Sequence, residues 1–289
     1  MTRSLALVTY DKLPLLSPDD QLVRAALERR GVRAEPVVWD DPSVEWARFD
    51  AIVVRSCWDY HLRYEQFMRW IDARAAEDVV LWNPPSLLHW NSDKRYLREL
   101  EERGVAVVPT CWVERGSHAT LAEICAIMGW TDLVVKPAVS ASAHSTWRAL
   151  PSRQADAERF TREIGQGTVL VQPLVEQVAR DGELSLVFLG ESFSHAVVKR
   201  PKPGDFRVQH EHGGSADLVR VSDEVIEEAA RALSAAPAST IYARVDGCLV
   251  DGGFVLMELE LLEPSLFFSL APAAAERFAE LLSNAIATT

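Results

Sequence analysis

Four charged side chains near the end of the sequence have the spacing that would let them bind a cation together. They are Arg244, Asp246, Glu258 and Glu260. Two apolar runs flank residues 251–253, an Asp-Gly-Gly sequence that predicts a β-hairpin turn. If those three residues form the loop, the arginine lies opposite the second glutamate and the aspartate lies opposite the first. All four side chains then project from one face of the hairpin.

Three carboxylates on one face of a hairpin repel one another unless a cation lies between them. Ligand sets made only of oxygen favour Mg2+, which keeps part of its water shell and shares the rest with phosphate. The pattern therefore predicts a magnesium site at Asp246, Glu258 and Glu260. A hairpin with a hydrated, charged face is the alternative at this point.

Composition limits the classes of protein to which the chain can belong. Its 289 residues can bury a large core in one to three domains, and 48% apolar with 25% charged residues is ordinary globular usage. The balance of 30 basic against 42 acidic residues, a net charge of −12, argues against nucleic acid or an anionic membrane as a partner. Dispersed cysteines, with no signal peptide and no apolar stretch of roughly 18 residues, predict a cytoplasmic protein.

The first part of the chain alternates strand and helix patterns, which predicts a parallel α/β sheet. The expected strands are residues 5–10, 37–39, 51–54 and 79–82, and the expected helices are residues 17–31 and 64–76. No GxGxxG motif follows the first strand, so a dinucleotide site lacks its main support. Ligands collect at the carboxyl ends of such strands. The candidate substrate-binding residues there are Arg55, Ser56, Asp59 and Tyr60, with a salt-bridged capping loop as the alternative.

Lysines and small residues in the middle of the chain indicate phosphate binding. Lys94 is expected in the first turn of a helix that runs to residue 103, where the helix dipole disfavours a cation that has no anion to bind. Lys136 ends a predicted strand, and residues 138–146 after it are almost all small, which would let backbone N–H groups approach phosphate. A solvated lysine and a disordered loop are the alternatives.

A basic loop over residues 199–214 is unusual in so acidic a chain. Lys199 and Arg207 suit contact with phosphate or substrate. His210 and His212 in the same loop form only a weak candidate for a metal site, because no further soft ligand is close in sequence.

Taken in order, these features resemble the ATP-grasp superfamily, most closely its prokaryotic glutathione synthetase and D-alanine–D-alanine ligase members. The resemblance covers residues 83–268. It implies a fold of the α/β and α+β classes, in which an N-terminal Rossmann-like pre-ATP-grasp domain precedes the ATP-grasp fold. The implied domains are residues 1–92, residues 93–118 with 174–289, and a central lid at 119–173. Stretches such as VVRSCWDYHLR also look like the D-cycloserine synthetase family.

The resemblance implies a role for individual residues. Those implied to bind ATP are Lys94, Lys136 and Ser140 for phosphates, Gln172, Leu174 and Val175 for adenine, and Glu183 for ribose. Those implied to act on the transferred phosphoryl group are Lys199, Arg207 and Arg244, with Asp246, Glu258 and Glu260 as ligands of Mg2+. The sequence departs from the family pattern at two places. The third metal ligand is commonly Asn in the family but is Glu260 here, and residues 263–265 stand where the relatives often have a Pro-Gly turn. The substrate end of the site is therefore not transferable.

The implied activity is that of an ADP-forming carbon–nitrogen ligase. A small, amino-acid-like carboxylate would become an acyl phosphate that a nitrogen nucleophile attacks, chemistry that needs positioned cations but no protein nucleophile. Ring closure within O-ureido-D-serine, as in biosynthesis of the antibiotic cycloserine, is one version. An intermolecular dipeptide- or glutathione-type ligase and a non-catalytic ATP-binding scaffold are the alternatives. A homodimer is expected, because dimers are common in the superfamily.

Overall fold

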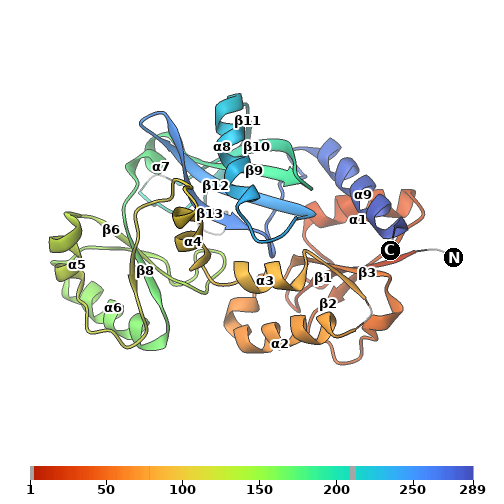
Figure 1. Cartoon of the computed structure of the whole chain (residues 1–289), viewed down its shortest axis with the longest axis horizontal. Coiled ribbons are helices and arrows are strands. Elements are labelled where there is room, and N and C mark those ends of the chain that lie inside the picture. The colour runs from red at the N-terminus through yellow and green to blue at the C-terminus, as the bar shows by residue number, and fades with distance from the viewer. Residues whose placement is uncertain (1–2, 78, 203, 209–212, 289) are drawn as a thin grey trace.

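The structure is a computed structural model that describes residues 3–77, 79–202, 204–208 and 213–288. Within these residues the strands form three sheets. Figure 1 shows an N-terminal sheet, a small sheet at the other end of the molecule and a larger sheet between them. His210 and His212 lie outside the described residues. No described helix is both long enough and apolar enough to cross a lipid bilayer.

The N-terminal sheet is parallel, with the strand order β2-β1-β3-β4, and confirms the predicted α/β arrangement. Its strands are β1 (Ser4–Thr9), β2 (Arg33–Val38), β3 (Ala51–Ser56) and β4 (Val80–Trp82). Its helical segments are α1 (Pro18–Arg29), η1 (Trp46–Arg48), η2 (Tyr60–Arg63), α2 (Tyr64–Ala75) and α3 (Pro85–Asn91). Strands β1 and β3 are buried along their whole length, because hydrophobic clusters cover both faces of the sheet.

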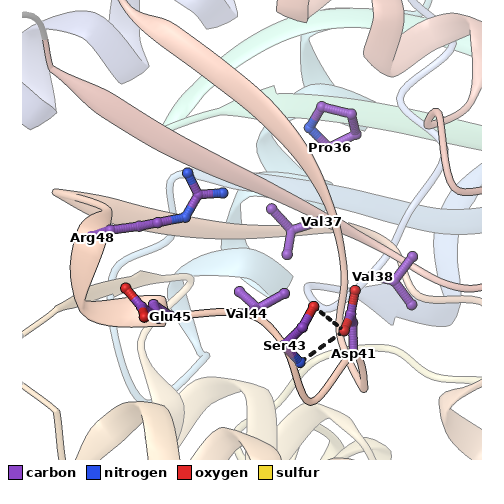
Figure 2. A pocket seen from close by; sticks show the side chains of 8 residues that line it. All are labelled: Pro36, Val37, Val38, Asp41, Ser43, Val44, Glu45 and Arg48. Atoms are coloured by element: carbon purple, nitrogen blue, oxygen red, sulfur yellow. Dashed lines mark hydrogen bonds between the residues drawn. The ribbon is translucent and has the colours of Figure 1, made fainter.

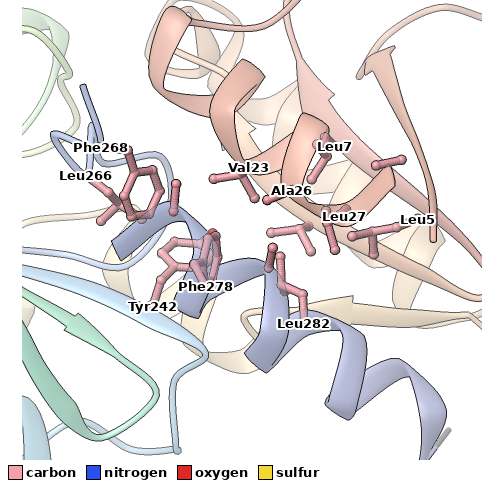
Figure 3. Packing of buried hydrophobic residues seen from close by; sticks show 14 of the residues in the cluster. Leu5, Leu7, Val23, Ala26, Leu27, Tyr242, Leu266, Phe268, Phe278 and Leu282 are labelled. Atoms are coloured by element: carbon pink, nitrogen blue, oxygen red, sulfur yellow. The ribbon is translucent and has the colours of Figure 1, made fainter. Parts of the chain in front are cut away.

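The C-terminal helix α9 (Pro272–Ala287) packs against α1 and completes the core on one face of the N-terminal sheet. Figure 3 shows Phe278 and Leu282 of α9 beside Val23 and Leu27 of α1. The two ends of the chain therefore share one hydrophobic core, whereas the sequence-based division assigned residues 174–289 to another domain.

The larger sheet is antiparallel, with the strand order β11-β10-β9-β12-β13. Its strands are β9 (Glu183–Leu189), β10 (Ser192–Arg200), β11 (Ser215–Val219), β12 (Tyr242–Val250) and β13 (Gly253–Glu260). Helices α4 (Tyr96–Glu102) and α8 (Asp223–Ser234) bury their apolar sides in the hydrophobic cluster on one face, and α7 (Glu176–Asp181) precedes β9. The opposite face carries the polar side chains predicted to bind ligand.

The hairpin formed by β12 and β13 has the predicted pairing around the carboxylates but reaches it differently. Val250 pairs with Gly253, so the turn is one residue shorter than the sequence indicated. The register then shifts between Asp246 and Gly247, which is the mark of a β-bulge. The two differences cancel, and Arg244 lies opposite Glu260 and Asp246 opposite Glu258, as predicted.

The small sheet is antiparallel, with the order β5-β8-β6-β7. Its strands are β5 (Cys111–Val113), β6 (Leu133–Pro137), β7 (Trp147–Ala149) and β8 (Val169–Pro173), and α5 (Leu121–Met128) and α6 (Gln154–Gln166) pack on them. Strand β5 precedes residue 119, at which the predicted lid begins, so this sheet extends past that boundary. The division into domains itself stays a prediction.

Gly247 makes the bulge possible, and its replacement tests that point. A Cβ atom added to Gly247 would overlap the Phe254 ring and the Val255 carbonyl oxygen. We expect Gly247→Ala to destabilise the fold by about 1–3 kcal/mol, the usual effect of overpacking. Urea unfolding of the variant measures this. Gly165→Ala is the matched control, because no atom lies within 4 Å of the added Cβ in helix α6, and its stability should not fall. Equal stability of the two variants would contradict the role of Gly247.

Candidate active site

A cavity of about 1220 Å3 is lined by strands of the larger and the small sheet and by helices and loops of the N-terminal region. It collects most of the residues that the sequence indicated, from segments far apart in the chain. Those that line it are Tyr60, Lys94, Lys136, Ser140, Gln172, Leu174, Val175, Glu183, Lys199, Arg207, Arg244, Asp246, Glu258 and Glu260. Arg55, Ser56 and Asp59 do not line it. The cavity is thus the candidate site, but direct substrate contact by those three residues finds no support in this geometry.

Buried ion pairs connect the polar face of the larger sheet. Asp246 accepts hydrogen bonds from Arg244 (2.8 Å), Lys199 (3.0 Å) and the Ser185 hydroxyl (2.6 Å). Lys199 also pairs with Glu183 at 2.5 Å, and Arg244 pairs with Glu260 at 2.5 Å. Burial by itself would raise the pKa of Asp246, but Arg244 and Lys199 outweigh it and hold that pKa below its usual range.

The acids of the hairpin differ in how far the protein neutralises them. Burial raises the pKa of Glu260 to about 7 in spite of the attraction of Arg244. The pKa of Glu258 falls below its ordinary value, because Lys94 and Lys136 outweigh the effect of burial. One oxygen of Glu258 lies 3.1 Å from the Lys94 ammonium. Among the described residues, the second oxygen of Glu258 and that of Glu260 have no hydrogen-bond partner.

The fit of this face to a metal ion is therefore partial. No group of three His, Cys, Asp or Glu side chains among the described residues is arranged to hold a metal. Asp246 is surrounded by protein donors, whereas Glu258 and Glu260 each keep one oxygen that faces no donor. Their carboxylate chemistry fits a hard cation such as Mg2+, so these two side chains are the stronger candidates.

The two lysines predicted to meet phosphate lie at one wall of the cavity. The sequence indicated that Lys94 lies in the first turn of a helix. Helix α4 begins at Tyr96, however, so Lys94 precedes it. Its ammonium donates to the Ser140 carbonyl (2.6 Å), which joins it to the small-residue loop 138–146. Lys136 is buried, and its ammonium forms no hydrogen bond or ion pair with any described residue. Burial lowers its pKa although Glu258 favours the charged form.

The residues predicted to hold adenine and ribose also have partners within the protein. The Gln172 amide donates to the Thr110 hydroxyl (2.8 Å), and the Leu174 backbone N–H donates to the Asp132 carbonyl (2.9 Å). Arg207, at the edge of the cavity, is paired with Asp205 at 2.9 Å. These contacts fix the segments in place, and a nucleotide would use the remaining groups of residues 172–175 and Glu183.

The Arg55 cluster has a structural role, which agrees with the alternative of a salt-bridged capping loop. The Arg55 guanidinium is buried, pairs with Asp20 at 2.8 Å and donates to the Pro264 carbonyl at 2.9 Å. The Ser56 hydroxyl bonds the same aspartate. Asp59 accepts from the Trp39 indole at 3.0 Å and pairs with an arginine of η2. Of the four predicted substrate residues, Tyr60 alone lines the cavity.

Several lining residues were not predicted individually. They include Trp58, Asn91, Met257 and Phe206. The signal for Asn91 was its position three residues before Lys94, and its amide bonds the Leu259 carbonyl at 2.7 Å at the end of β13. Glu263 also lines the cavity and belongs to a stretch that the sequence placed at the substrate end of the site, where it departs from the family pattern.

A smaller cavity of about 480 Å3 lies at the edge of the N-terminal sheet (Figure 2). It is formed by the end of β2 and the loop after it, where Asp41 accepts hydrogen bonds from the backbone and hydroxyl of Ser43. None of the residues predicted to carry chemistry lines it. We therefore place the candidate site in the larger cavity.

A pair of histidines links the small-residue loop to the N-terminal domain. The rings of His61 and His144 lie with centroids 4.9 Å apart. Nδ1 of His61 is buried and has no hydrogen-bond partner. Burial, with smaller contributions from His144 and Lys94, lowers the pKa of His61 to about 4.

This pKa predicts that acid destabilises the protein in a defined interval. In the unfolded chain His61 titrates near 6.5, so below that pH the unfolded state takes up the proton first and stability falls towards pH 4. We expect His61→Phe to lose less stability than the wild type between pH 7 and pH 5, measured by urea unfolding. His118→Phe, at an exposed histidine, is the control and should keep the wild-type dependence. Identical pH dependence in all three proteins would contradict the prediction.

Comparison with known proteins identifies the family. Residues 5–83 match the family model of the N-terminal domain of D-cycloserine synthetase DcsG. The cycloserine biosynthesis protein DcsG of Streptomyces lavendulae is 33% identical over 96% of this chain and 94% of its own length. The crystal structure of D-cycloserine synthetase DcsG superposes with a TM-score of 0.89 at 31% identity, covering 98% of this chain and 99% of that one.

More distant structures share the fold. D-alanine–D-alanine ligase from Bacillus anthracis, solved in complex with ATP, gives a TM-score of 0.69 at 15% identity over 97% of this chain and 95% of the ligase. The ATP-grasp ligase PsnB gives 0.66 at 17% identity, with 98% of each chain covered. The predicted fold class is thus confirmed, and the chain belongs to the D-cycloserine synthetase family of ATP-grasp carbon–nitrogen ligases.

Proposed function

We propose that this ligase binds ATP in the cavity and uses it to activate the carboxylate of a small, amino-acid-like substrate. The observation that carries the proposal is the Lys136 ammonium, which is buried in the cavity wall and forms no hydrogen bond or ion pair with a described residue. Glu258 and Glu183 attract it without contacting it, and a buried charge without a direct contact is costly, so the site calls for an anion. Phosphate suits this position, because Lys94 and the small-residue loop 138–146 are adjacent.

The remaining residues match the needs of phosphoryl transfer, which relies on positioning and charge neutralisation. Lys199 and Arg244 would neutralise the charge of the group in transfer, with Arg207 nearby. Glu258 and Glu260 would hold Mg2+, and an oxygen of Asp246 would join them when Arg244 turns towards the phosphate. The bound ion would neutralise and align the phosphates of ATP.

The activated substrate would be an acyl phosphate, formed by attack of the carboxylate on the γ-phosphate with release of ADP. A nitrogen nucleophile would then displace phosphate and form the C–N bond. Because acyl phosphates hydrolyse, water must be excluded, and the loops at 138–146 and 199–214 are positioned to do this. We infer from the family that the nitrogen belongs to the same molecule, as in O-ureido-D-serine, so that a ring closes. A cytoplasmic homodimer remains part of the proposal.

The direct test is ADP release by the purified protein with ATP, Mg2+ and a panel that includes O-ureido-D-serine and common D- and L-amino acids. We expect substrate-dependent ADP release, with mass spectrometry identifying the product. A cyclised product supports the intramolecular reaction, whereas a condensed dimer or mixed product supports an intermolecular ligase. Tight ATP binding without ADP release across the panel would contradict the enzymatic proposal and favour a scaffold.

Lys136→Ala tests the phosphate site. The loss of one charge-assisted contact should weaken ATP binding about 10- to 100-fold, measured by calorimetry with a non-hydrolysable analogue. The control is Lys12→Ala, at an exposed lysine outside the cavity, which should bind like the wild type. An unchanged nucleotide affinity in the Lys136 variant would refute its role.

Glu258→Gln tests the metal site. The amide keeps the shape of the side chain but removes the charge that attracts Mg2+, so Mg2+-dependent ADP release should be abolished while the thermal midpoint changes by only a few degrees. Glu227→Gln on the exposed side of α8 is the control. ADP release at the wild-type rate from Glu258→Gln would exclude the assignment.

A further inference from the structure

The wall of the cavity next to the N-terminal sheet carries one acid whose side chain has no direct contact with a donor of the described residues. Glu263 lines the cavity, and its carboxylate forms no hydrogen bond or ion pair with any described residue. The acids of the hairpin, in contrast, each contact a lysine or arginine of the protein. Glu263 is therefore the acid of this wall that is left to interact with a ligand.

The other acids in this region have structural partners. Asp19, which also lines the cavity, accepts from the backbone N–H groups of Phe268 (3.0 Å) and Ser269 (2.8 Å). Asp20 is held by Arg55 and by the hydroxyls of Ser17 and Ser56. Asp19 thereby fixes the N-terminal domain to residues 265–269, and Asp20 fixes side chains within that domain, so neither is free to receive a ligand.

The backbone that carries Glu263 is fixed by three donors. The Trp58 indole donates to the carbonyl of Glu263 itself at 3.0 Å. Arg55 donates to the next carbonyl, that of Pro264, at 2.9 Å, and Arg244 donates to the one after it, that of Ser265, at 3.0 Å. Three successive carbonyls are thus held by side chains from β3, its loop and β12. The Glu263 side chain has a fixed origin, which is what a specific ligand contact requires.

The charge of Glu263 selects the class of group that it can receive. Burial and the nearby acids Glu260 and Glu258 raise the pKa of Glu263, because an ionised carboxylate in this wall is costly without donors. A cationic N–H group would supply both a donor and an opposite charge, and so favours the ionised form of Glu263 more than a neutral group does. We propose that Glu263 binds the ammonium group of an α-amino acid substrate and so makes this ligase selective for amino acids over the corresponding carboxylic acids. This inference rests on the proposed function and assigns the substrate end of the same cavity.

The geometry orients such a substrate. Arg244 donates to the Ser265 carbonyl while it pairs with Glu260, so it lies between the Glu263 segment and the acids of the hairpin. A ligand with its ammonium group at Glu263 can therefore direct its carboxylate towards Arg244 and the phosphate site. The ammonium contact would hold the carboxylate in position for phosphorylation, so its loss should affect the amino substrate alone.

The test compares each amino substrate with its desamino analogue. The probes are O-ureido-D-serine with 3-(ureidooxy)propanoic acid, and D- and L-alanine with propanoic acid, assayed by ADP release. We expect the wild type to prefer the amino member of its accepted pair by about 10- to 100-fold in kcat/KM. Glu263→Gln should remove most of that preference by raising KM for the amino member, with KM for ATP unchanged. Glu280→Gln, at an exposed acid of α9, is the matched control.

The outcomes separate this inference from the proposed function. Absence of ADP release with every probe and the wild type contradicts the proposed function and the inference with it. ADP release with the preference intact in Glu263→Gln contradicts the inference alone. A higher Mg2+ requirement in the variant, with the preference intact, assigns the carboxylate to the metal and also overturns the inference. Thermal unfolding of Glu263→Gln shows whether it is folded, and Glu263→Asp, which keeps the charge, should restore part of the preference.

Discussion

The shared hold of Arg244 and Lys199 on Asp246 is the interaction on which the site depends. These three side chains come from β12 and β10 and are buried in the sheet face that lines the cavity. Apolar packing would stabilise the sheet as well or better, since moving charges out of water costs about as much as their pairing returns. The network makes sense as a device that keeps cations in place beside Glu258 and Glu260, where a phosphate and its metal would bind.

The hairpin shows what sequence reasoning could and could not derive. Alternation along the strands was enough to place the arginine and three acids on one face, and the structure has that pairing. The sequence did not show how the strands reach this pairing, because the shorter turn is offset by the bulge beside Gly247. At the bulge, the Phe254 ring and the Val255 carbonyl lie close to that glycine. The bulge also lets Leu256 and Leu259 face the core while the acids face the cavity.

The Arg55 cluster shows why the sequence could not decide between a ligand site and a salt-bridged loop. A polar group at the carboxyl end of a parallel strand is a reasonable ligand site, but the partners of Arg55 are 35 residues away at Asp20 and 209 residues away at Pro264. Spacing within one strand contains no information about such contacts. For the same reason α9 could not be assigned to the N-terminal core, since its apolar side fits α1 only in three dimensions. The motifs predicted to bind ATP were recognisable because the residues of each motif are close together in the sequence.

The cavity reconciles an acidic chain with the proposed binding of a highly anionic nucleotide. Its net charge of −12 is spread over the whole molecule, whereas the field inside a partly enclosed cavity is set by the nearest buried groups. There most acids among the described residues contact a protein cation, whereas neither the ammonium of Lys136 nor the carboxyl group of Glu263 forms a hydrogen bond or ion pair with a described residue. A cavity with one basic and one acidic group that lack direct protein contacts is suited to two ligands, an anionic nucleotide and a substrate that carries a positive charge. That complementarity links the choice of substrate to the residues that replace the family's usual turn.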